Sequence, residues 1–313
     1  MTTLTTIKSH IQNDLQEVDK IINDTFNTTK NQTLTDIYTH LLNVKGKQIR
    51  ASIIILISKM TTPDNNKSYL KLAAGIELIH LASLIHDDII DNATIRRNQP
   101  TVHTKFNTNN GIISGVHCYA LALKLISSIG DPHTISIISL AVIDLCEGES
   151  EQVNNRHNFN LTIENYWDII QKKTSALFKA ACESAAHLSK LTPSDAHHLA
   201  TYGQILGSIF QLSDDYLDIF DTTNNLSKKI MQDLATGDIS LPILLASKQS
   251  QSSDTSSIKD TLKSNGKTIS TAIKNELNKE KELAFKELDQ VSSELSTEHL
   301  KSILTIISDR VDH

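Results

Sequence analysis

The chain has 313 residues, of which 39% are hydrophobic, and a formal net charge of −6. A net negative chain lacks the basic surface that nucleic-acid binding requires, and three widely spaced cysteines fit neither a zinc motif nor a disulfide framework. The first 16 residues lack the apolar core of a signal peptide, and the longest aliphatic run, residues 53–57, is too short to cross a bilayer. We therefore expect a cytoplasmic protein.

Helical periodicity dominates the chain. Apolar residues recur at steps of three and four in residues 68–80, 166–173 and 199–212, without the alternation typical of strands. Polar breaks are predicted at residues 61–67, 107–111, 130–134, 154–162, 190–195 and 222–229. Thr192, Pro193 and Asp195 form a helix-start pattern, and the serine-rich residues 247–257 are the best candidate for a loop. Since we find no repeat or linker, we expect a single all-α domain over residues 1–313.

Two acidic motifs of the form DDxxD stand far apart, and each follows an apolar helical run. Their residues are Asp87, Asp88 and Asp91, and Asp214, Asp215 and Asp218. On a helix the first and last aspartates of such a motif share one face, so that they can hold a magnesium ion and leave sites for phosphate oxygens. One DDxxD is more often a solvated helix end and arises by chance in roughly one chain in ten, whereas two are about ten times less frequent.

Basic residues stand near both acidic motifs and in two other places. They are Arg96 and Arg97, Lys228 and Lys229, Lys172 and Lys173, and Lys47 and Arg50 within a Gly-Lys-x-x-Arg sequence. Carboxylates recruit metal ions, whereas arginine and lysine contact phosphate directly. Together they indicate diphosphate chemistry, in which the charge on a leaving pyrophosphate must be stabilised.

In order and spacing, these motifs resemble those of the trans-isoprenyl diphosphate synthases along nearly the whole chain. The two acidic motifs are similar to the family's two aspartate-rich regions. Further matches are the GKxxR sequence at Gly46–Arg50, the GExxQ sequence at residues 148–152, Lys173-Thr174, Phe210-Gln211, and Asp233-Leu234 with Gly237 and Leu241-Pro242. Several of these are short, but their order and spacing together are specific.

The resemblance implies a helical bundle around a central cavity, of the isoprenoid-synthase type. It also implies a magnesium-dependent prenyltransferase that condenses isopentenyl diphosphate with an allylic diphosphate, farnesyl or geranylgeranyl diphosphate. The allylic carbon–oxygen bond ionises, the isopentenyl double bond attacks, and a proton is lost to the released pyrophosphate. A homodimer is implied as well, with at most peripheral membrane contact for product release.

The resemblance also implies a role for each matching residue. Magnesium bridged to the allylic diphosphate is implied at Asp87, Asp88, Asp91, Asp214, Asp215 and Asp218. The allylic diphosphate itself is expected to contact Arg96, Lys173 and Lys228. The diphosphate of isopentenyl diphosphate is expected to contact Lys47, Arg50, His80 and Arg97. Lys173, Thr174 and Gln211 form the catalytic set, with Thr174 and Gln211 near the developing carbocation.

The chain departs from the family pattern in four places. Asn98 and Ser227 stand where glycine is usual, and His117-Cys118 where many members have Gly-Asp. Asp238 stands where lysine is common, which predicts that one cation near the diphosphates is missing.

Small residues precede the first acidic motif, where bulky ones limit product length in this family. Ala82 and Ser83 are expected to leave an open tunnel lined by residues such as Ile79 and Leu123. The prediction is a long product, hexaprenyl to octaprenyl or longer. The alternative is that Ala82 and Ser83 only permit a tight helix contact.

Two other functions remain open. A class I terpene cyclase shares the first aspartate motif, but it normally carries an Asn/Ser/Glu metal motif in place of the second. A catalytic subunit that needs a partner chain would keep both aspartate motifs, as this sequence does.

Overall fold

The computed structural model describes residues 3–44, 46–61, 67–221, 231–292 and 294–312. Contacts divide the chain into two compact units: unit 1 is Met1–Ser139 with Ala181–Ala196, and unit 2 is Leu140–Ala180 with His197–His313. Whether the units form a single domain stays a prediction.

Helices make up most of the described chain, as the periodicity predicted. Those that lie wholly in unit 1 are α1 (Leu4–His10), α2 (Gln12–Asn27), α3 (Gln32–Leu42), α4 (Ile49–Ser58), α5 (Ser68–Ile90), α6 (Val102–Phe106) and α7 (Thr108–Ser127). Isoleucine is a modest helix former, yet Ile53, Ile54 and Ile55 of α4 are all 0% exposed. Burial of apolar side chains therefore stabilises helices that propensity alone would not.

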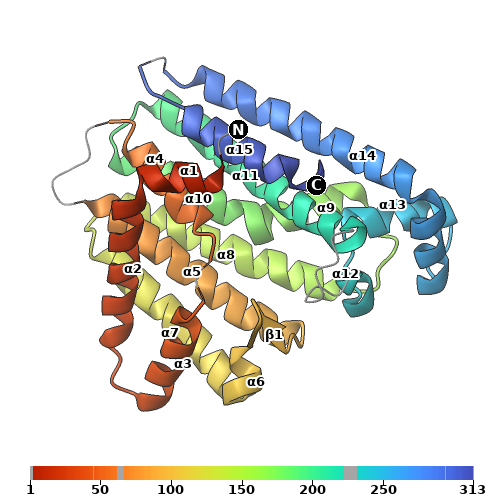
Figure 1. Ribbon diagram of the computed structural model, residues 1–313, viewed down its shortest axis with the longest axis horizontal. Coiled ribbons are helices and arrows are strands. Elements are labelled where there is room, and N and C mark those ends of the chain that lie inside the picture. Colours follow the sequence, from red (N-terminus) through yellow and green to blue (C-terminus); the bar gives the residue numbers. More distant parts are fainter. Residues whose placement is uncertain (1–2, 45, 62–66, 222–230, 293, 313) are drawn as a thin grey trace. The chain divides into compact units, whose positions relative to one another are not determined.

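Helix α5 is at the centre of unit 1. It packs against α7, α4 and α2, and α5 and α7 lie side by side (Figure 1). Gly75 of α5 lies against the Ile126 side chain of α7, and Gly115 of α7 lies against the His86 ring of α5, so closely that neither glycine has room for a Cβ atom. These two glycines allow the close approach of the two helices.

By length and composition alone, α5 could cross a membrane, which a count of consecutive aliphatic residues had missed. However, 67% of its most apolar 18-residue window is buried within the protein. A buried core helix passes the same test, so the composition of α5 is accounted for by its packing.

Unit 2 is also helical. Its own elements are α9 (Ile163–Ile170), the π-helical turn η1 (Gln171–Ser175), α12 (Gln232–Thr236), α13 (Leu241–Ser250), α14 (Thr255–Gln290), α15 (Glu298–Ser308) and the 3₁₀ turn η2 (Asp309–Asp312). Three further helices have residues in both units: α8 (Pro132–Asn154), α10 (Ala176–Leu188) and α11 (Pro193–Phe220). Helix α14 packs against α13 and α15 through an apolar stripe that includes Ile269, Ile273 and Leu277.

The predicted helix start before α11 is confirmed. Thr192 Oγ1 accepts a hydrogen bond from the Asp195 amide at 3.1 Å and donates one to the Asp195 carboxylate at 2.7 Å. Each side chain thus supports the first turn of the helix.

One predicted break and the predicted loop are wrong in extent, and two predicted breaks lie wholly or largely outside the described residues. Only Asn107 separates α6 from α7, because its side chain caps the Asn110 amide at 3.0 Å and the new helix begins at once. The serine-rich loop is shorter than predicted: α13 continues to Ser250 and α14 begins at Thr255. The Ser250 hydroxyl donates to the Ser247 carbonyl, so the serines satisfy backbone groups at the helix end. Residues 222–229 fall within the segment 222–230, and most of the predicted break at 61–67 falls within the segment 62–66; neither segment is described.

Candidate active site

The first aspartate motif lies at the C-terminal end of α5. Asp91 caps the helix, and its amide donates to the Asp87 carbonyl at 2.8 Å. Asp87 and Asp91 are half-buried and stand one turn apart, as predicted, whereas Asp88 is only 5% exposed. Because neighbouring residues on a helix point about 100° apart, Asp88 faces a different direction from Asp87.

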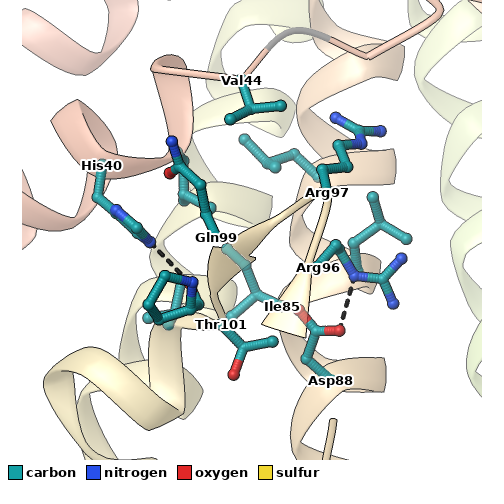
Figure 2. Close-up of a pocket in the computed structure, with 13 residues that line it drawn as sticks. His40, Val44, Ile85, Asp88, Arg96, Arg97, Gln99 and Thr101 are labelled. Atoms are coloured by element: carbon teal, nitrogen blue, oxygen red, sulfur yellow. Dashed lines mark hydrogen bonds and ion pairs between the residues drawn. The ribbon is translucent and has the colours of Figure 1, made fainter. Parts of the chain in front are cut away.

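Asp88 is paired with Arg96 (Figure 2). Arg96 Nε donates to Asp88 Oδ1 at 2.6 Å. Burial raises the pKa of Asp88 above its usual value, and the charge and hydrogen bond of Arg96 oppose that rise. Arg96 therefore stabilises the carboxylate, and the carboxylate fixes the direction of the guanidinium.

The two arginines are carried by a short hairpin. Strand β1 (Ile95–Arg96) pairs antiparallel with β2 (Gln99–Pro100). The two turn residues, Arg97 and Asn98, have φ angles of 51° and 61°, the left-handed values of a type I′ turn. Asparagine enters this region at a lower cost than other non-glycine residues, so Asn98 preserves the turn where the family has glycine.

A pocket lies beside the hairpin (Figure 2). It has about 470 Å³ of empty space, including its open mouth, and Asp88, Arg96 and Arg97 line it together with His40 and Ile85. The structure thus brings together three predicted site residues, Asp88 of the first aspartate motif and the two arginines that follow it. The other predicted residues of unit 1 do not line this pocket.

The GKxxR sequence meets the hairpin at Gly46. A Cβ atom at Gly46 would lie 3.0 Å from Arg97 Nη2, so glycine lets the backbone lie against the guanidinium. Lys47 is exposed, whereas Arg50 is only 8% exposed.

His80 is surrounded by positive charge. Its pKa lies well below the usual value because of burial and the nearby Arg50, Arg97 and Arg96. The imidazole is therefore neutral, and it can hydrogen-bond to an anion without adding charge.

In unit 2, Lys173 and Thr174 lie in the π-helical turn η1. Glycines on two neighbouring helices let this turn pack closely: a Cβ at Gly148 of α8 would lie 2.5 Å from Lys173 N, and one at Gly207 of α11 would lie 2.5 Å from Ser175 Cα. The sequence predicted an ordinary helix here, since a π turn leaves no simple trace in apolar periodicity. Such turns often occur at functional sites.

Lys173 is held by the mid-chain GExxQ sequence. Its Nζ lies 2.6 Å from Glu149 Oε2, an ion pair without the angles of a good hydrogen bond. The neighbouring Lys172 contacts Glu151 at 2.5 Å. Two sequence motifs more than 20 residues apart thus form one charged cluster.

A chain of hydrogen bonds links the predicted catalytic residues to the second aspartate motif. The Thr174 hydroxyl donates to Gln211 Oε1 at 2.7 Å, and Gln211 Nε2 donates to Asp215 Oδ1 at 2.8 Å. The Tyr166 hydroxyl donates to Asp215 Oδ2 at 2.7 Å. Burial raises the pKa of Asp215 to about 6, although these two donors oppose the rise. Tyr166, for which the sequence analysis predicted only a place in an apolar helical run, therefore belongs to the site.

The other two aspartates of the second motif have different partners. Arg310 of η2 lies with Nη2 2.5 Å from Asp214 Oδ1. Asp218 accepts hydrogen bonds from the Gln232 and Asp233 amides at 3.1 and 3.2 Å, at the start of α12. Asp214 thus faces a cation, Asp215 faces two side-chain donors, and Asp218 faces a helix N-terminus.

No three His, Cys, Asp or Glu side chains in the described ranges are grouped so that they could hold a metal ion by themselves. The half-buried carboxylates still suit magnesium, because that ion binds one or two carboxylates and keeps waters and phosphate oxygens as its other ligands.

Asp238 forms an ion pair with an arginine. Arg156 Nε donates to Asp238 Oδ1 at 2.9 Å. Burial alone would raise the pKa of Asp238, but hydrogen bonds from Arg156, Thr236 and Gln152 hold it below the usual value. Arg156 lies 82 residues away in sequence, and the predicted loss of one cation near the diphosphates stays a prediction.

The remaining predicted residues are placed as follows. Lys228 and Ser227 lie outside the described residues. Ala82 and Ile79 are 0% exposed and Ser83 is 7% exposed, whereas Leu123 is 41% exposed.

Sequence reasoning missed Arg310, Arg156 and Asp233. Asp233 is half-buried, and its pKa lies well above the usual value because of desolvation and the nearby Asp215, Asp218 and Asp238. Of the three, Asp233 had a signal, since it belongs to a matched segment. The two arginines belong to no motif, and only the fold brings them to the acids.

A family model for polyprenyl synthetases matches residues 31–279. A prenyl transferase from Cyanophora paradoxa is 33% identical over 251 residues, which cover 80% of this chain and 77% of the relative. An octaprenyl diphosphate synthase from Escherichia coli is 34% identical over 215 residues, covering 69% and 66%. A heptaprenyl diphosphate synthase component 2 from Geobacillus stearothermophilus is 32% identical over 207 residues, covering 66% and 64%. The chain thus spans slightly less than two thirds of the length of the last two relatives.

Solved structures are similar over nearly the whole chain. A heptaprenyl diphosphate synthase from Staphylococcus aureus has a TM-score of 0.85 at 28% identity, covering 97% of this chain and 98% of that one. A polyprenyl synthase from Caulobacter crescentus, complexed with calcium and isoprenyl diphosphate, has a TM-score of 0.82 at 25% identity, covering 99% and 98%. Both support the predicted all-α, isoprenoid-synthase type of fold.

Proposed function

The chain belongs to the polyprenyl synthetase family, and on this premise we propose that it condenses isopentenyl diphosphate with farnesyl or geranylgeranyl diphosphate. The product would be a long all-trans polyprenyl diphosphate. The observation that carries the proposal is the hydrogen-bonded chain from Thr174 through Gln211 to Asp215. It joins the residues proposed to face the carbocation to a residue of the second aspartate motif.

A divalent cation, magnesium, is part of the proposal. Each unit offers half-buried carboxylates of its own for such ions: Asp87 and Asp91 in unit 1, and Asp214 in unit 2. The relative from Caulobacter crescentus, complexed with calcium and isoprenyl diphosphate, supports a requirement for a divalent metal. When bound, the cation draws charge from the allylic diphosphate and so favours cleavage of the carbon–oxygen bond.

In unit 1, side chains oriented in advance bind diphosphate. Arg96 is held by Asp88 and presents the rest of its guanidinium to the allylic diphosphate. The diphosphate of isopentenyl diphosphate is bound by Lys47, Arg50, His80 and Arg97.

In unit 2, Lys173 is held beside Thr174 by Glu149 and contacts the allylic diphosphate, as Lys228 also would. The oxygens of Thr174 and Gln211 stabilise the developing allylic cation. Because the Thr174 hydroxyl donates its hydrogen to Gln211, the lone pairs of the Thr174 oxygen remain available to face positive charge. The proton lost in the last step goes to the released pyrophosphate.

A second copy of the chain is the proposed partner. Ile112, Ile113 and Val116 of α7 are 46%, 54% and 58% exposed, an apolar surface that a homodimer would cover. The name of the Geobacillus stearothermophilus relative, component 2, favours a second candidate: a catalytic subunit that needs a different chain. A cytoplasmic location, with at most peripheral membrane contact, rests on the sequence alone.

Pyrophosphate release by the purified chain tests the proposal. Release is expected only when magnesium, farnesyl diphosphate and isopentenyl diphosphate are all present. Release without isopentenyl diphosphate would indicate a cyclase instead. No release, with binding of both substrates intact, would favour the partner-dependent subunit.

A further inference from the structure

Helix α4 begins without a capping side chain of its own. Its N-cap residue, Gln48, has a left-handed φ of 49° and makes no side-chain cap. The Gln48 side chain instead donates through Nε2 to Asp19 Oδ1 at 2.8 Å. The first turn of α4, which carries Arg50, therefore depends on an acceptor from elsewhere.

Glu77 of α5 supplies that acceptor. Its Oε1 accepts a hydrogen bond from the Ala51 amide at 3.0 Å. Ala51 is the third residue of α4, and a capping side chain normally accepts from the amide at this position. A residue 26 positions away in sequence thus caps the helix.

Glu77 also lies near several cations. Arg50 of α4, Lys8 of α1 and Arg97 of the hairpin all favour its charged form, against the effect of burial. Glu77 balances part of this positive charge. His80 lies one helical turn further along the same face of α5 and is affected by Arg50 and Arg97 too.

We propose that Glu77 is a positioning residue that fixes the N-terminal turn of α4, so that Arg50 and Lys47 hold the diphosphate of isopentenyl diphosphate. The inference rests on the proposed function for the identity of that ligand. Glu77 acts through the Ala51 amide and the Arg50 guanidinium and does not itself contact the substrate. Loss of Glu77 therefore weakens the binding of isopentenyl diphosphate and leaves the binding of the allylic diphosphate unchanged.

Calorimetric binding of isopentenyl diphosphate tests this inference without turnover. Glu77→Ala is expected to raise the Kd roughly tenfold, because the diphosphate-binding turn loses its preorganisation. Glu77→Gln keeps an oxygen that can accept a hydrogen bond from the Ala51 amide. Its Kd for isopentenyl diphosphate is therefore expected to stay within about threefold of the wild-type value. For variants that turn over, the KM for isopentenyl diphosphate should rise in parallel, with the KM for farnesyl diphosphate unchanged.

Two controls separate positioning from stability. Glu17→Ala removes an exposed glutamate of α2, and Tyr69→Phe removes the hydrogen bond from Tyr69 to Asp14. Tyr69→Phe should lower the melting temperature without changing the Kd.

Three results would overturn the inference. They are an unchanged Kd for isopentenyl diphosphate in Glu77→Ala, an equal increase of that Kd in Glu77→Ala and Glu77→Gln, and a similar increase of that Kd in Tyr69→Phe. A wild-type chain that binds isopentenyl diphosphate but does not elongate contradicts the proposed function alone. A wild-type chain that does not bind it overturns both.

Discussion

Replacing Ala82 with phenylalanine is expected to shorten the product. Helix α5 rises 1.5 Å per residue, so position 82 lies roughly 7.5 Å along its axis from Asp87. Ile79 and Gly75 continue the same face at roughly 12 and 18 Å. Ile126 packs against Gly75 on that face. A phenyl ring at position 82 would therefore stop a growing chain roughly 7.5 Å along the axis from Asp87.

The competing explanation is tight packing. Ala82 is 0% exposed, and overpacking at such a site typically costs about 1–3 kcal/mol of stability. In that case Ala82→Phe lowers the free energy of unfolding and leaves product length unchanged. Ala73, also 0% exposed, points to the opposite face of α5 and provides the matched control.

The assay compares dephosphorylated products by reversed-phase chromatography and mass spectrometry, with urea unfolding in parallel. The tunnel predicts a shorter product for Ala82→Phe, and lost stability without shortening for Ala73→Phe. An Ala82→Phe enzyme that still makes the wild-type product would refute the tunnel along α5.

Three further substitutions test the site in unit 2. Tyr166→Phe removes a donor to the buried Asp215 carboxylate and should lower the free energy of unfolding in urea by about 1.5–3 kcal/mol; an unchanged value would mean that the bond does not stabilise the fold. Arg310→Gln removes the cation beside Asp214 and should tighten calorimetric Mn²⁺ binding by about two- to fivefold, consistent with a part-exposed pair, whereas weaker binding would make Arg310 a support of the metal site. Gly148→Ala places a methyl group against the backbone of η1 and should reduce kcat by roughly tenfold or more while farnesyl diphosphate still binds; wild-type kcat would show that η1 tolerates the shift.

Most of the helical fold could be predicted from the sequence, because apolar periodicity reports the buried faces directly. The start of α11 was predicted to the residue, since Thr192 and Asp195 act on their own helix. The break near Asn107 was overestimated, because one capping residue can end one helix and begin the next. Polar composition alone did not distinguish such a junction from a loop.

The site was predictable where its residues form local motifs. Asp88 and Arg96 belong to one such motif, and the structure brings them together. The contacts of Arg310 with Asp214, and of Arg156 with Asp238, join residues 96 and 82 positions apart. No sequence spacing encodes them, because each depends on the packing of helices within unit 2.

The most direct test of the central claim is incorporation of labelled isopentenyl diphosphate by the purified chain with magnesium and farnesyl diphosphate. We expect a ladder of products, each one five-carbon unit longer than the last, that ends at a long polyprenyl diphosphate. Absence of any elongated product, with the protein folded and both substrates present, would contradict the claim that this chain is by itself a polyprenyl diphosphate synthase.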